Sequence, residues 1–254
     1  ASLGGKAGLL SVTGDDEAAD ALDALMAQDG VASYLMRDKQ IATTVKLRVV
    51  ARNQQLIRLD FEEHPNREVL EQIKQKYREV LPEYDAIIFS DYGKGGLSHI
   101  SDMIDWAKHA GKTVLIDPKG DDYEKYAGAT LITPNRAELK EVVGSWKNES
   151  ELTEKAQNLR RHLDLTAVLL TRSEEGMTLF SEGEPIYQPT RAQEVYDVSG
   201  AGDTVIAGVG LGLAAGYTMP EAMHLANTAA GVVVAKLGTA VCSFAELNKA
   251  LEEQ

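Results

Sequence analysis

A short run of small residues with a carboxylate at each end is the stretch of this sequence best suited to chemistry. The run is Asp197-Val198-Ser199-Gly200-Ala201-Gly202-Asp203. An apolar stretch follows from Val205, so the pattern predicts a tight turn that opens a helix. The first amides of a helix point outward at the positive end of its dipole and form a ready anion site, which glycine lets a ligand approach closely. Asp203 would stand beside the held anion, where it can take a proton from an attacking hydroxyl, as phosphoryl transfer requires.

The same run has a simpler interpretation, an aspartate cap after a glycine-rich loop, which would suffice for a lone G-x-G-D. All seven residues, however, resemble the second signature of the phosphofructokinase-B/ribokinase family of sugar kinases, D-[ST]-x-G-A-G-D or D-x-[ST]-G-A-G-D. The resemblance implies that Asp203 is the catalytic base. It also implies that the amides of Gly200, Ala201 and Gly202 form the anion hole, with ATP as the phosphoryl donor.

A second candidate site begins where Pro134 ends an apolar stretch. Asn135 and Glu138 follow it one helical turn apart and therefore share a face. The pair resembles the N-x-x-E motif of the same family, which implies a role in organising Mg²⁺ and the nucleotide phosphates, with Glu138 holding the metal through water. The alternative is a capping box at the start of a helix.

Three further segments resemble nucleotide-binding parts of the family. Thr171, Ser173 and Gly176 match a T-x-G-x-x-G segment, except that Ser173 replaces the usual first glycine; a plain strand–turn–strand connection is the alternative. Asn227 and Gly231 lie in a small-residue stretch of the helix expected over 220–236, which borders adenine in the family, although close helix packing would explain it equally well.

Further polar residues are expected to contact phosphate or the sugar. Lys94 and Lys119 each follow an expected strand beside a glycine, and lysine is a point charge suited to phosphate. Asp91 and Arg48 are further candidates for the substrate, while exposed surface lysines are the alternative for the lysine pair. In many relatives the loop 236–239 joins the first acid of the signature, here Asp197, at a monovalent cation site, so K⁺ is a possible cofactor.

Composition limits the class of protein. The chain has 254 residues, a net charge of −13 and one cysteine, Cys242. The acidic balance argues against nucleic acid or an anionic membrane as a partner, and the single cysteine favours a reducing cytoplasm. No G-x-x-x-x-G-K-[ST] loop is present, so a Walker-type kinase is not expected, and the absence of an early G-x-G-x-x-G argues against a dehydrogenase.

Periodicity predicts a single α/β domain over 1–254, with a ribokinase-like doubly wound, mostly parallel sheet, helices on both faces and a small antiparallel β lid. Strands are expected at 7–13, 31–37, 43–50, 57–61, 86–89, 114–116, 131–132, 167–170, 177–180 and 185–188. Helices are expected at 16–28, 67–81, 99–110, from 135, and at 149–163, 201–215, 220–236 and 243–252. The lid would comprise strands at about 31–62, with a turn at Arg52-Asn53 and one solvated face, and its edges could pair with a second subunit as a homodimer. Ala1–Gly5 is interpreted as the end of a helix, so an upstream strand–helix unit is expected to be missing.

Longer phrases such as Ser90-Asp91-Tyr92-Gly93-Lys94-Gly95 and Ile116-Asp117-Pro118-Lys119-Gly120 resemble one branch of the family in particular. That branch phosphorylates a heptose 7-phosphate at O1, and its kinase domain is fused to a nucleotidyltransferase, which this sequence lacks. The resemblance implies the same reaction here. Another sugar kinase of the family and a non-catalytic ATP-binding fragment remain as alternatives.

Overall fold

The computed structural model describes residues 1–51, 54–191 and 195–253. The chain folds into two compact units. The N-terminal unit comprises Ala1, Gly5–Leu81 and Gly93–His99. The C-terminal unit comprises Ser2–Gly4, Pro82–Tyr92 and Ile100–Gln254.

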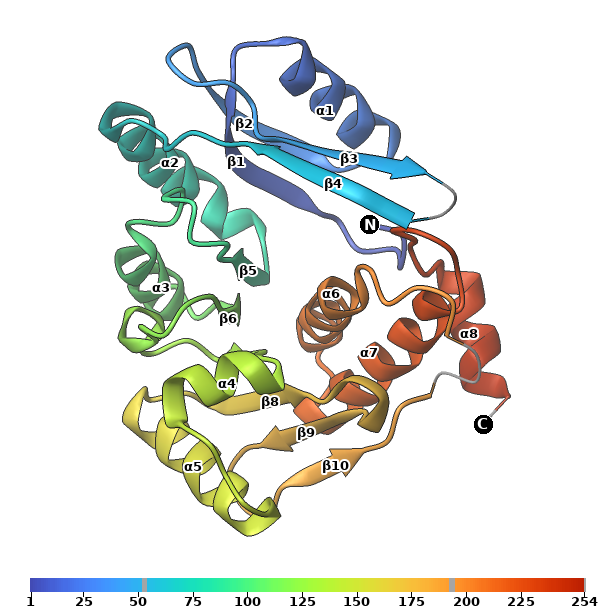
Figure 1. Cartoon of the computed structure of the whole chain (residues 1–254). Helices are drawn as coiled ribbons and strands as arrows, with labels where there is room; N and C mark the ends of the chain where they lie inside the picture. The colour runs from blue at the N-terminus through green and yellow to red at the C-terminus, as the bar shows by residue number, and fades with distance from the viewer. Residues whose placement is uncertain (52–53, 192–194, 254) are drawn as a thin grey trace. The chain divides into compact units, whose positions relative to one another are not determined.

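The N-terminal unit contains two small sheets and two helices (Figure 1). Strands β1 (Gly8–Gly14) and β2 (Ala32–Asp38) pair in parallel around helix α1 (Glu17–Gln28). Asp16 caps α1 by accepting a hydrogen bond from the Ala19 amide. Helix α2 (Arg67–Val80) begins after a similar cap, Asn66, and buries one apolar stripe.

A β-hairpin forms the second small sheet. Strands β3 (Val45–Ala51) and β4 (Gln54–Phe61) are antiparallel, as expected, and the predicted turn at Arg52-Asn53 lies outside the described residues. Leu47 stands opposite Leu59, so the apolar side chains of both strands share one face.

Two expectations for this region are corrected. Because β2 pairs with β1 in parallel, it is not part of the antiparallel hairpin, although the lid was expected to begin near residue 31. Only one face of the hairpin was expected to be solvated, yet every residue of β3 is exposed, because no described residue of its own unit buries the apolar face. Period-two alternation predicts the faces of a strand but not whether a partner covers them.

The C-terminal unit is built on a six-stranded sheet in the order β10-β9-β8-β7-β6-β5. Its strands are β5 (Ala86–Ser90), β6 (Thr113–Asp117), β7 (Leu131–Ile132), β8 (Ala167–Thr171), β9 (Met177–Phe180) and β10 (Ile186–Gln188). The four strands from β5 to β8 are parallel, and β9 and β10 continue the sheet in antiparallel pairs. The central residues of the middle strands are apolar, as burial on both faces requires.

Helices cover both faces of this sheet (Figure 1). One face carries α3 (Ile100–His109), α4 (Arg136–Val143) and α5 (Glu149–His162). The other carries α6 (Ala201–Ala214) and α7 (Met219–Val234), and α8 (Phe244–Glu252) packs on α7. Short 3₁₀ turns, η1 (Leu81–Glu83), η2 (Glu124–Tyr126) and η3 (Ser173–Glu175), complete the secondary structure. The predicted α/β architecture is therefore confirmed.

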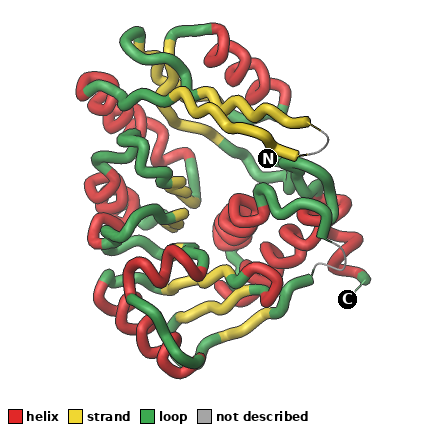
Figure 2. The backbone as a smooth tube through the Cα atoms, viewed as in Figure 1, coloured by secondary structure: helices red, strands yellow, loops and turns green. Residues whose placement is uncertain are grey.

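Small residues let α6 and α7 approach closely, and Figure 2 shows the two helices side by side. A Cβ added at Gly212 would lie 2.9 Å from the Cβ of Ala222, and one at Gly208 would lie 3.0 Å from the Cα of Ala226. Ser2 and Leu3 lie in a turn, and Gly4 follows it with φ +91°. No helix in the described part of the chain is long and apolar enough to cross a membrane.

Candidate active site

The candidate residues of the C-terminal unit follow the parallel strands at one edge of the sheet. Asp91 comes directly after β5, Asp117 ends β6, Asn135 lies three residues beyond β7, and Thr171 ends β8. In open α/β sheets the ligand site lies at this edge. The adjacent placement of Asn135 and Thr171 is direct, because the two residues form an isolated parallel bridge.

The N-terminus of α6 differs from the expected anion hole at Ala201, and an anion site there stays a prediction. Gly200 is the N-cap in the left-handed conformation, with φ +79°, which favours glycine. The Ala201 amide donates to the Val198 carbonyl at 3.2 Å, so it is already engaged. Within the described residues, the amides of Gly200, Gly202 and Asp203 donate to no protein acceptor. Asp203 is exposed in the first turn of α6, so both the free amides and the carboxylate remain open to a ligand.

Negative charge gathers around Asp117, close to Asp203. Burial, followed by the carboxylates of Glu138 and Asp203, raises the pKa of Asp117 to about 6. Lys119 opposes this shift. The Asp203 carboxylate also raises the pKa of the Tyr92 hydroxyl, ahead of burial. These mutual effects place Asp117, Glu138 and Asp203 in one electrostatic neighbourhood.

Asn135 and Glu138 form a complete capping box at the start of α4. The Asn135 side chain accepts from the amides of Ala137 and Glu138, at 2.9 and 3.0 Å, and Glu138 Oε2 accepts from the Asn135 amide at 2.9 Å. The other oxygen of Glu138 lies 3.3 Å from Lys119 Nζ. The capping interpretation is therefore confirmed, and the magnesium role of Glu138 stays a prediction. Lys119 lies beside this carboxylate, with its side chain 55% exposed and available to an arriving phosphate.

The turn after β8 explains the usual glycine at the position of Ser173. Ser173 has φ +53°, in the left-handed region where non-glycine residues are uncommon. Gly176 has φ +100°, and a Cβ there would lie 2.1 Å from the Gln188 carbonyl oxygen, so glycine is required. Thr171 is held against the start of α4, because its amide donates to the Pro134 carbonyl at 3.0 Å. The strand–turn–strand connection is thus present, and nucleotide contact by these residues stays a prediction.

Helix α7 carries the other two expected nucleotide residues. Asn227 is buried, and its side-chain amide nitrogen Nδ2 donates to the Pro189 carbonyl at 2.7 Å. Gly231 lies one turn further along the helix and is partly buried. The close approach of α6 and α7 confirms that helix packing accounts for small residues in the earlier turns of α7. An adenine-binding role for Asn227 and Gly231 stays a prediction.

Asp197, the first acid of the signature, links the signature loop to the loop 236–239. Its carboxylate accepts from the amides of Ser199, at 2.9 Å, and Gly238, at 3.1 Å. The Ser199 hydrogen bonds, and then the Gly238 amide, hold the pKa of Asp197 below its usual value.

Two further candidates, Asp91 and Lys94, have partners within their own units, and a third, Arg48, lies on the hairpin. Asp91 is buried and accepts from Lys125 Nζ at 2.8 Å and from the Tyr126 hydroxyl at 2.7 Å. Lys94 forms an ion pair with Glu62 in the N-terminal unit. Arg48 stands opposite Arg58 in the hairpin of the same unit and is exposed. Substrate contact by Asp91, Lys94 and Arg48 therefore stays a prediction.

Sequence reasoning included Asp117 in a phrase that resembles one branch of the family but gave it no role in the site. The position of Asp117 at the end of a buried strand could have indicated a role, because its charge must then lie at the boundary of the core. Its special environment depends on Glu138 and Asp203, which are distant in sequence and were not expected to act on it.

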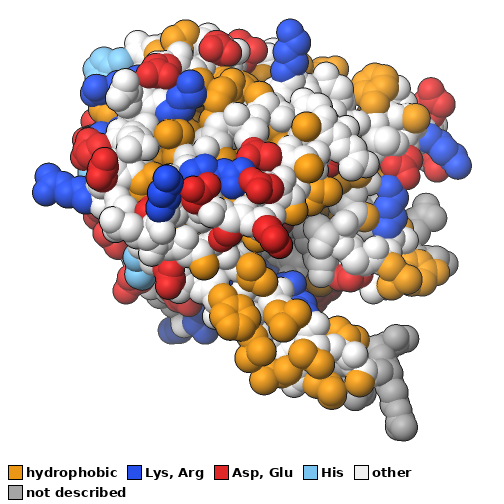
Figure 3. All heavy atoms as spheres, turned by 90° about the horizontal axis from the view of Figure 1, so that it is seen from above, with side chains coloured by type: hydrophobic (Ala, Val, Ile, Leu, Met, Phe, Trp, Pro, Cys, Tyr) orange, Lys and Arg blue, Asp and Glu red, His pale blue; other side chains and the backbone are white. Residues whose placement is uncertain are grey.

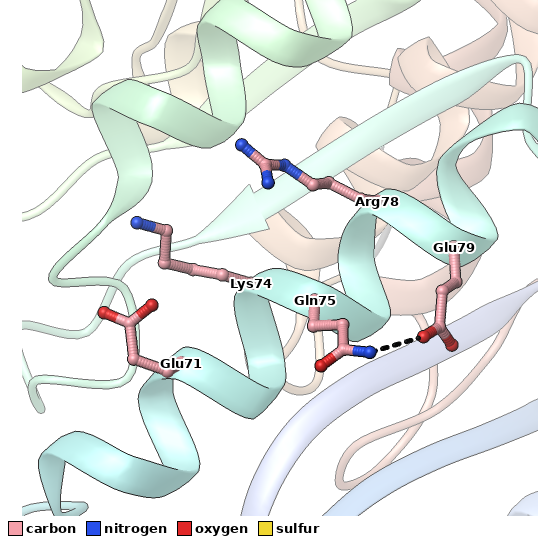
Figure 4. Close-up of a pocket in the computed structure, with 5 residues that line it drawn as sticks. All are labelled: Glu71, Lys74, Gln75, Arg78 and Glu79. Carbon is pink, nitrogen blue, oxygen red and sulfur yellow. Dashed lines mark hydrogen bonds between the residues drawn. The ribbon is translucent and has the colours of Figure 1, made fainter.

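A hollow on the surface of α2 is separate from these residues and holds none of the candidates. Figure 4 shows that the side chains lining it all come from this one helix of the N-terminal unit, and that Gln75 donates to Glu79 at 3.2 Å. The lining residues are Glu71, Lys74, Gln75, Arg78 and Glu79. A ligand there would contact a single helix, so we assign it no binding role.

Comparison with known proteins gives close relatives and a shared fold. Over 252 residues the chain is 52% identical to a protein of Chromohalobacter salexigens named bifunctional protein HldE, covering 99% of this chain and 53% of that protein. It is 48% identical to the D-beta-D-heptose 7-phosphate kinase of Bordetella bronchiseptica, covering 97% of this chain and 79% of the relative. The chain thus spans only about half the length of the bifunctional relatives it matches.

Solved structures agree at the level of the fold. Phosphofructokinase-2 from Escherichia coli in complex with potassium superposes with a TM-score of 0.83 at 19% identity, covering 99% of this chain and 83% of that one. Arabidopsis thaliana ribokinase complexed with ribose and ATP gives a TM-score of 0.82 at 20% identity with the same coverage. The model of the pfkB family carbohydrate kinases matches residues 1–245. With nearly the whole chain matched, this protein belongs to the pfkB family of carbohydrate kinases.

Proposed function

We propose that this chain phosphorylates D-glycero-β-D-manno-heptose 7-phosphate at O1 with ATP, giving the 1,7-bisphosphate used in ADP-heptose synthesis for the lipopolysaccharide core. The observation that carries the proposal is the 48% identity, over 97% of the chain, to a heptose 7-phosphate kinase. The open amides and exposed carboxylate at the N-terminus of α6 supply a chemical rationale, since a transferring phosphoryl group needs both.

In the proposed reaction the O1 hydroxyl of the sugar attacks the terminal phosphorus of ATP. Asp203 takes the hydroxyl proton, the new O–P bond forms, and the bond to the β-phosphate oxygen breaks to release ADP. The amides of Gly202 and Asp203 stabilise the negative charge of the moving phosphoryl group, assisted by the dipole of α6. Thr171, Ser173, Gly176, Asn227 and Gly231 are assigned to the nucleotide, and Lys119, Lys94, Arg48 and Asp91 to phosphate or sugar.

Among the described residues no group of three or more histidine, cysteine, aspartate or glutamate side chains is arranged to hold a metal ion directly, so we propose that Mg²⁺ is held here largely through water. Carboxylates are ligands that Mg²⁺ prefers, and the raised pKa of Asp117 marks a concentration of negative charge that a cation would relieve. Glu138 would hold Mg²⁺ through water, and the metal would neutralise phosphate charge. We propose that K⁺ binds near Asp197. The Asp197 carboxylate accepts a hydrogen bond from the Gly238 amide and so joins that loop to the signature.

Asp203→Asn tests the proposal directly. With heptose 7-phosphate and ATP, we expect kcat to fall by about 10²–10⁴-fold while ATP affinity measured by calorimetry is retained, since the change removes a proton acceptor and keeps the side-chain shape. Asp121→Asn, an exposed acid with no assigned role, is the matched control. Retained turnover in Asp203→Asn would exclude its role as base.

A substrate panel separates the two alternatives. Faster turnover of ribose or fructose 6-phosphate than of heptose 7-phosphate would indicate another sugar kinase of the family. ATP binding without turnover of any sugar would indicate a non-catalytic nucleotide-binding chain.

We also propose that the chain forms a homodimer through the hairpin β3–β4. Figure 3 shows hydrophobic side chains gathered on this hairpin, and the residues that share its apolar face are 40–55% exposed. They are Val45, Leu47, Val49, Ile57, Leu59 and Phe61. We expect Leu47→Asp to shift the species seen by light scattering from dimer to monomer, because it places charge in a buried interface. Lys46→Asp, on the opposite face, should leave a dimer, and a monomeric unmodified chain would contradict the proposal.

In the full-length protein we propose fusion to a nucleotidyltransferase and action in the cytoplasm. The first is supported by the 53% coverage of relatives named bifunctional, and the second by one unpaired, buried cysteine, Cys242.

A further inference from the structure

Four charged side chains join the turn after β8 to the helices beside it. Glu175, at the end of the turn, accepts hydrogen bonds from Nη1 and Nη2 of Arg136 in the first turn of α4. The distance from Nη2 to Oε2 is 2.8 Å. The same oxygen accepts from Arg172 Nη2 at 2.8 Å. Arg172 in turn forms a bidentate pair with Glu149, the first residue of α5, at 2.7 and 2.8 Å.

Arg172 is the buried centre of this network, with its side chain only 8% exposed. It also donates to the Thr178 hydroxyl at 3.2 Å, and its guanidinium lies 5.7 Å from the centre of the Tyr187 ring. The Tyr187 hydroxyl donates to the Glu175 carbonyl at 2.6 Å. The turn is therefore held from α4, α5, β9 and β10 together, and bidentate charge-assisted pairs of this kind are strong and directional.

The network is electrically balanced, with two arginines and two glutamates. Hydrogen bonding to Glu149 raises the pKa of Arg172, and hydrogen bonding to Arg136 lowers the pKa of Glu175, so both shifts favour the charged forms of these two groups. Since each guanidinium already has carboxylate partners, these arginines are committed to the protein and are poorly placed to serve as phosphate ligands.

The two segments that Glu175 joins are those assigned to the nucleotide. One carries Asn135 and Glu138, and the other carries Thr171 and Gly176. The backbone joins α4 to the start of the turn, through the Thr171 amide and the Pro134 carbonyl, whereas the Glu175 side chain joins α4 to its end. The intervening Ser173 is left-handed at φ +53°, a conformation that persists only when its surroundings enforce it.

We infer that Glu175 is a positioning residue for ATP, which fixes the turn 171–176 against the start of α4 so that both segments meet the nucleotide in one geometry. The inference rests on the proposed function, because it assumes that these segments bind ATP. Removing the charge of Glu175 would leave two guanidinium groups short of a partner, and the Nε atoms of Arg136 and Arg172 are already buried without one in the described structure.

Glu175→Gln tests the inference, with Glu174→Gln as the matched control, because Glu174 is the exposed neighbour in the same turn. We expect Glu175→Gln to weaken ATP binding by about 10-fold, in both calorimetric Kd and KM for ATP, the size expected for residues coupled in one network. The KM for the sugar and kcat should stay within about twofold, because the base and anion hole are untouched. If Glu175 had a purely structural role, Glu175→Gln would lower the melting temperature without raising the KM for ATP more than the KM for the sugar.

Arg136→Gln provides the second arm, since it removes the same pair from the other side and answers the question if Glu175→Gln does not fold. Combining the two substitutions should weaken ATP binding no more than Glu175→Gln alone, because Arg136→Gln removes an ion pair that Glu175→Gln has already removed. Additive losses, or an ATP affinity in Glu175→Gln equal to that of Glu174→Gln, would overturn the inference alone. Failure of the unmodified chain to bind ATP would overturn the proposed function as well.

Discussion

Replacing Asp117 with asparagine should stabilise the protein, and should do so only where the carboxylate is charged. Burial and the carboxylates of Glu138 and Asp203 raise the pKa of Asp117 from 3.8 to about 6. A rise of about two units corresponds to about 3 kcal/mol of differential free energy. Partial exposure screens the charges, so we expect a measured gain of about 1–2 kcal/mol.

The sign of the effect follows from proton binding. Below pH 3.8 Asp117 is protonated in the folded and unfolded chains, so its ionisation costs nothing. As the pH rises through 6 the folded chain must ionise a group that the unfolded chain has already ionised, and the free energy of unfolding falls. Asparagine can still accept a hydrogen bond from Ser90 and carries no charge, so the variant lacks this loss.

Urea unfolding followed by circular dichroism in metal-free buffer measures the difference. We expect Asp117→Asn and the unmodified chain to be equally stable near pH 4, and the variant to be more stable by about 1–2 kcal/mol at pH 7. Asp121→Asn, in an exposed loop, should show no such pH-dependent gain. A gain of the same size at pH 4 and pH 7, or a loss of stability at pH 7, would refute the argument.

Two further predictions concern the turn after β8. Gly176→Ala should cost about 4 kcal/mol or more, because its Cβ would lie 2.1 Å from the Gln188 carbonyl oxygen. Gly183→Ala, at a similar φ of +93° but with open space around it, should cost only about 1 kcal/mol; equal shifts in thermal melting temperature would contradict the clash. Ser173→Gly should be neutral within about 0.5 kcal/mol, because relief of left-handed strain offsets the greater freedom of glycine in the unfolded chain. Ser173→Val should lose about 2 kcal/mol in urea unfolding, and no difference between the two Ser173 variants would argue against the left-handed conformation.

Local features of the sequence predicted much of the structure. The caps at Asp16 and Asn135 and the alternation of β3 and β4 depend on residues a few positions apart, so spacing alone indicated them. The parallel order of β5 to β8 followed from the alternation of strands and helices.

The remaining features depend on residues that only the fold brings together. Arg136 and Glu175 are separated by 39 positions, and no local pattern links them. Tertiary structure likewise decides that β2 pairs with β1 in parallel. It also decides that the residues of β3 are exposed. Motif matching identified the segments to which chemistry is assigned but not the contacts that hold them in place.

Helix α6 has one charged residue, Asp203, in its 14 positions, and residues such as Val205, Ile206 and Val209 are buried in the core. Ions and water therefore reach the backbone dipoles mainly at the exposed first turn. The low dielectric constant of the core around α6 concentrates the electric field of the helix dipole at the exposed N-terminus. The attraction for an incoming polyanion is thus directed to a single point on a protein whose net charge of −13 would otherwise repel it.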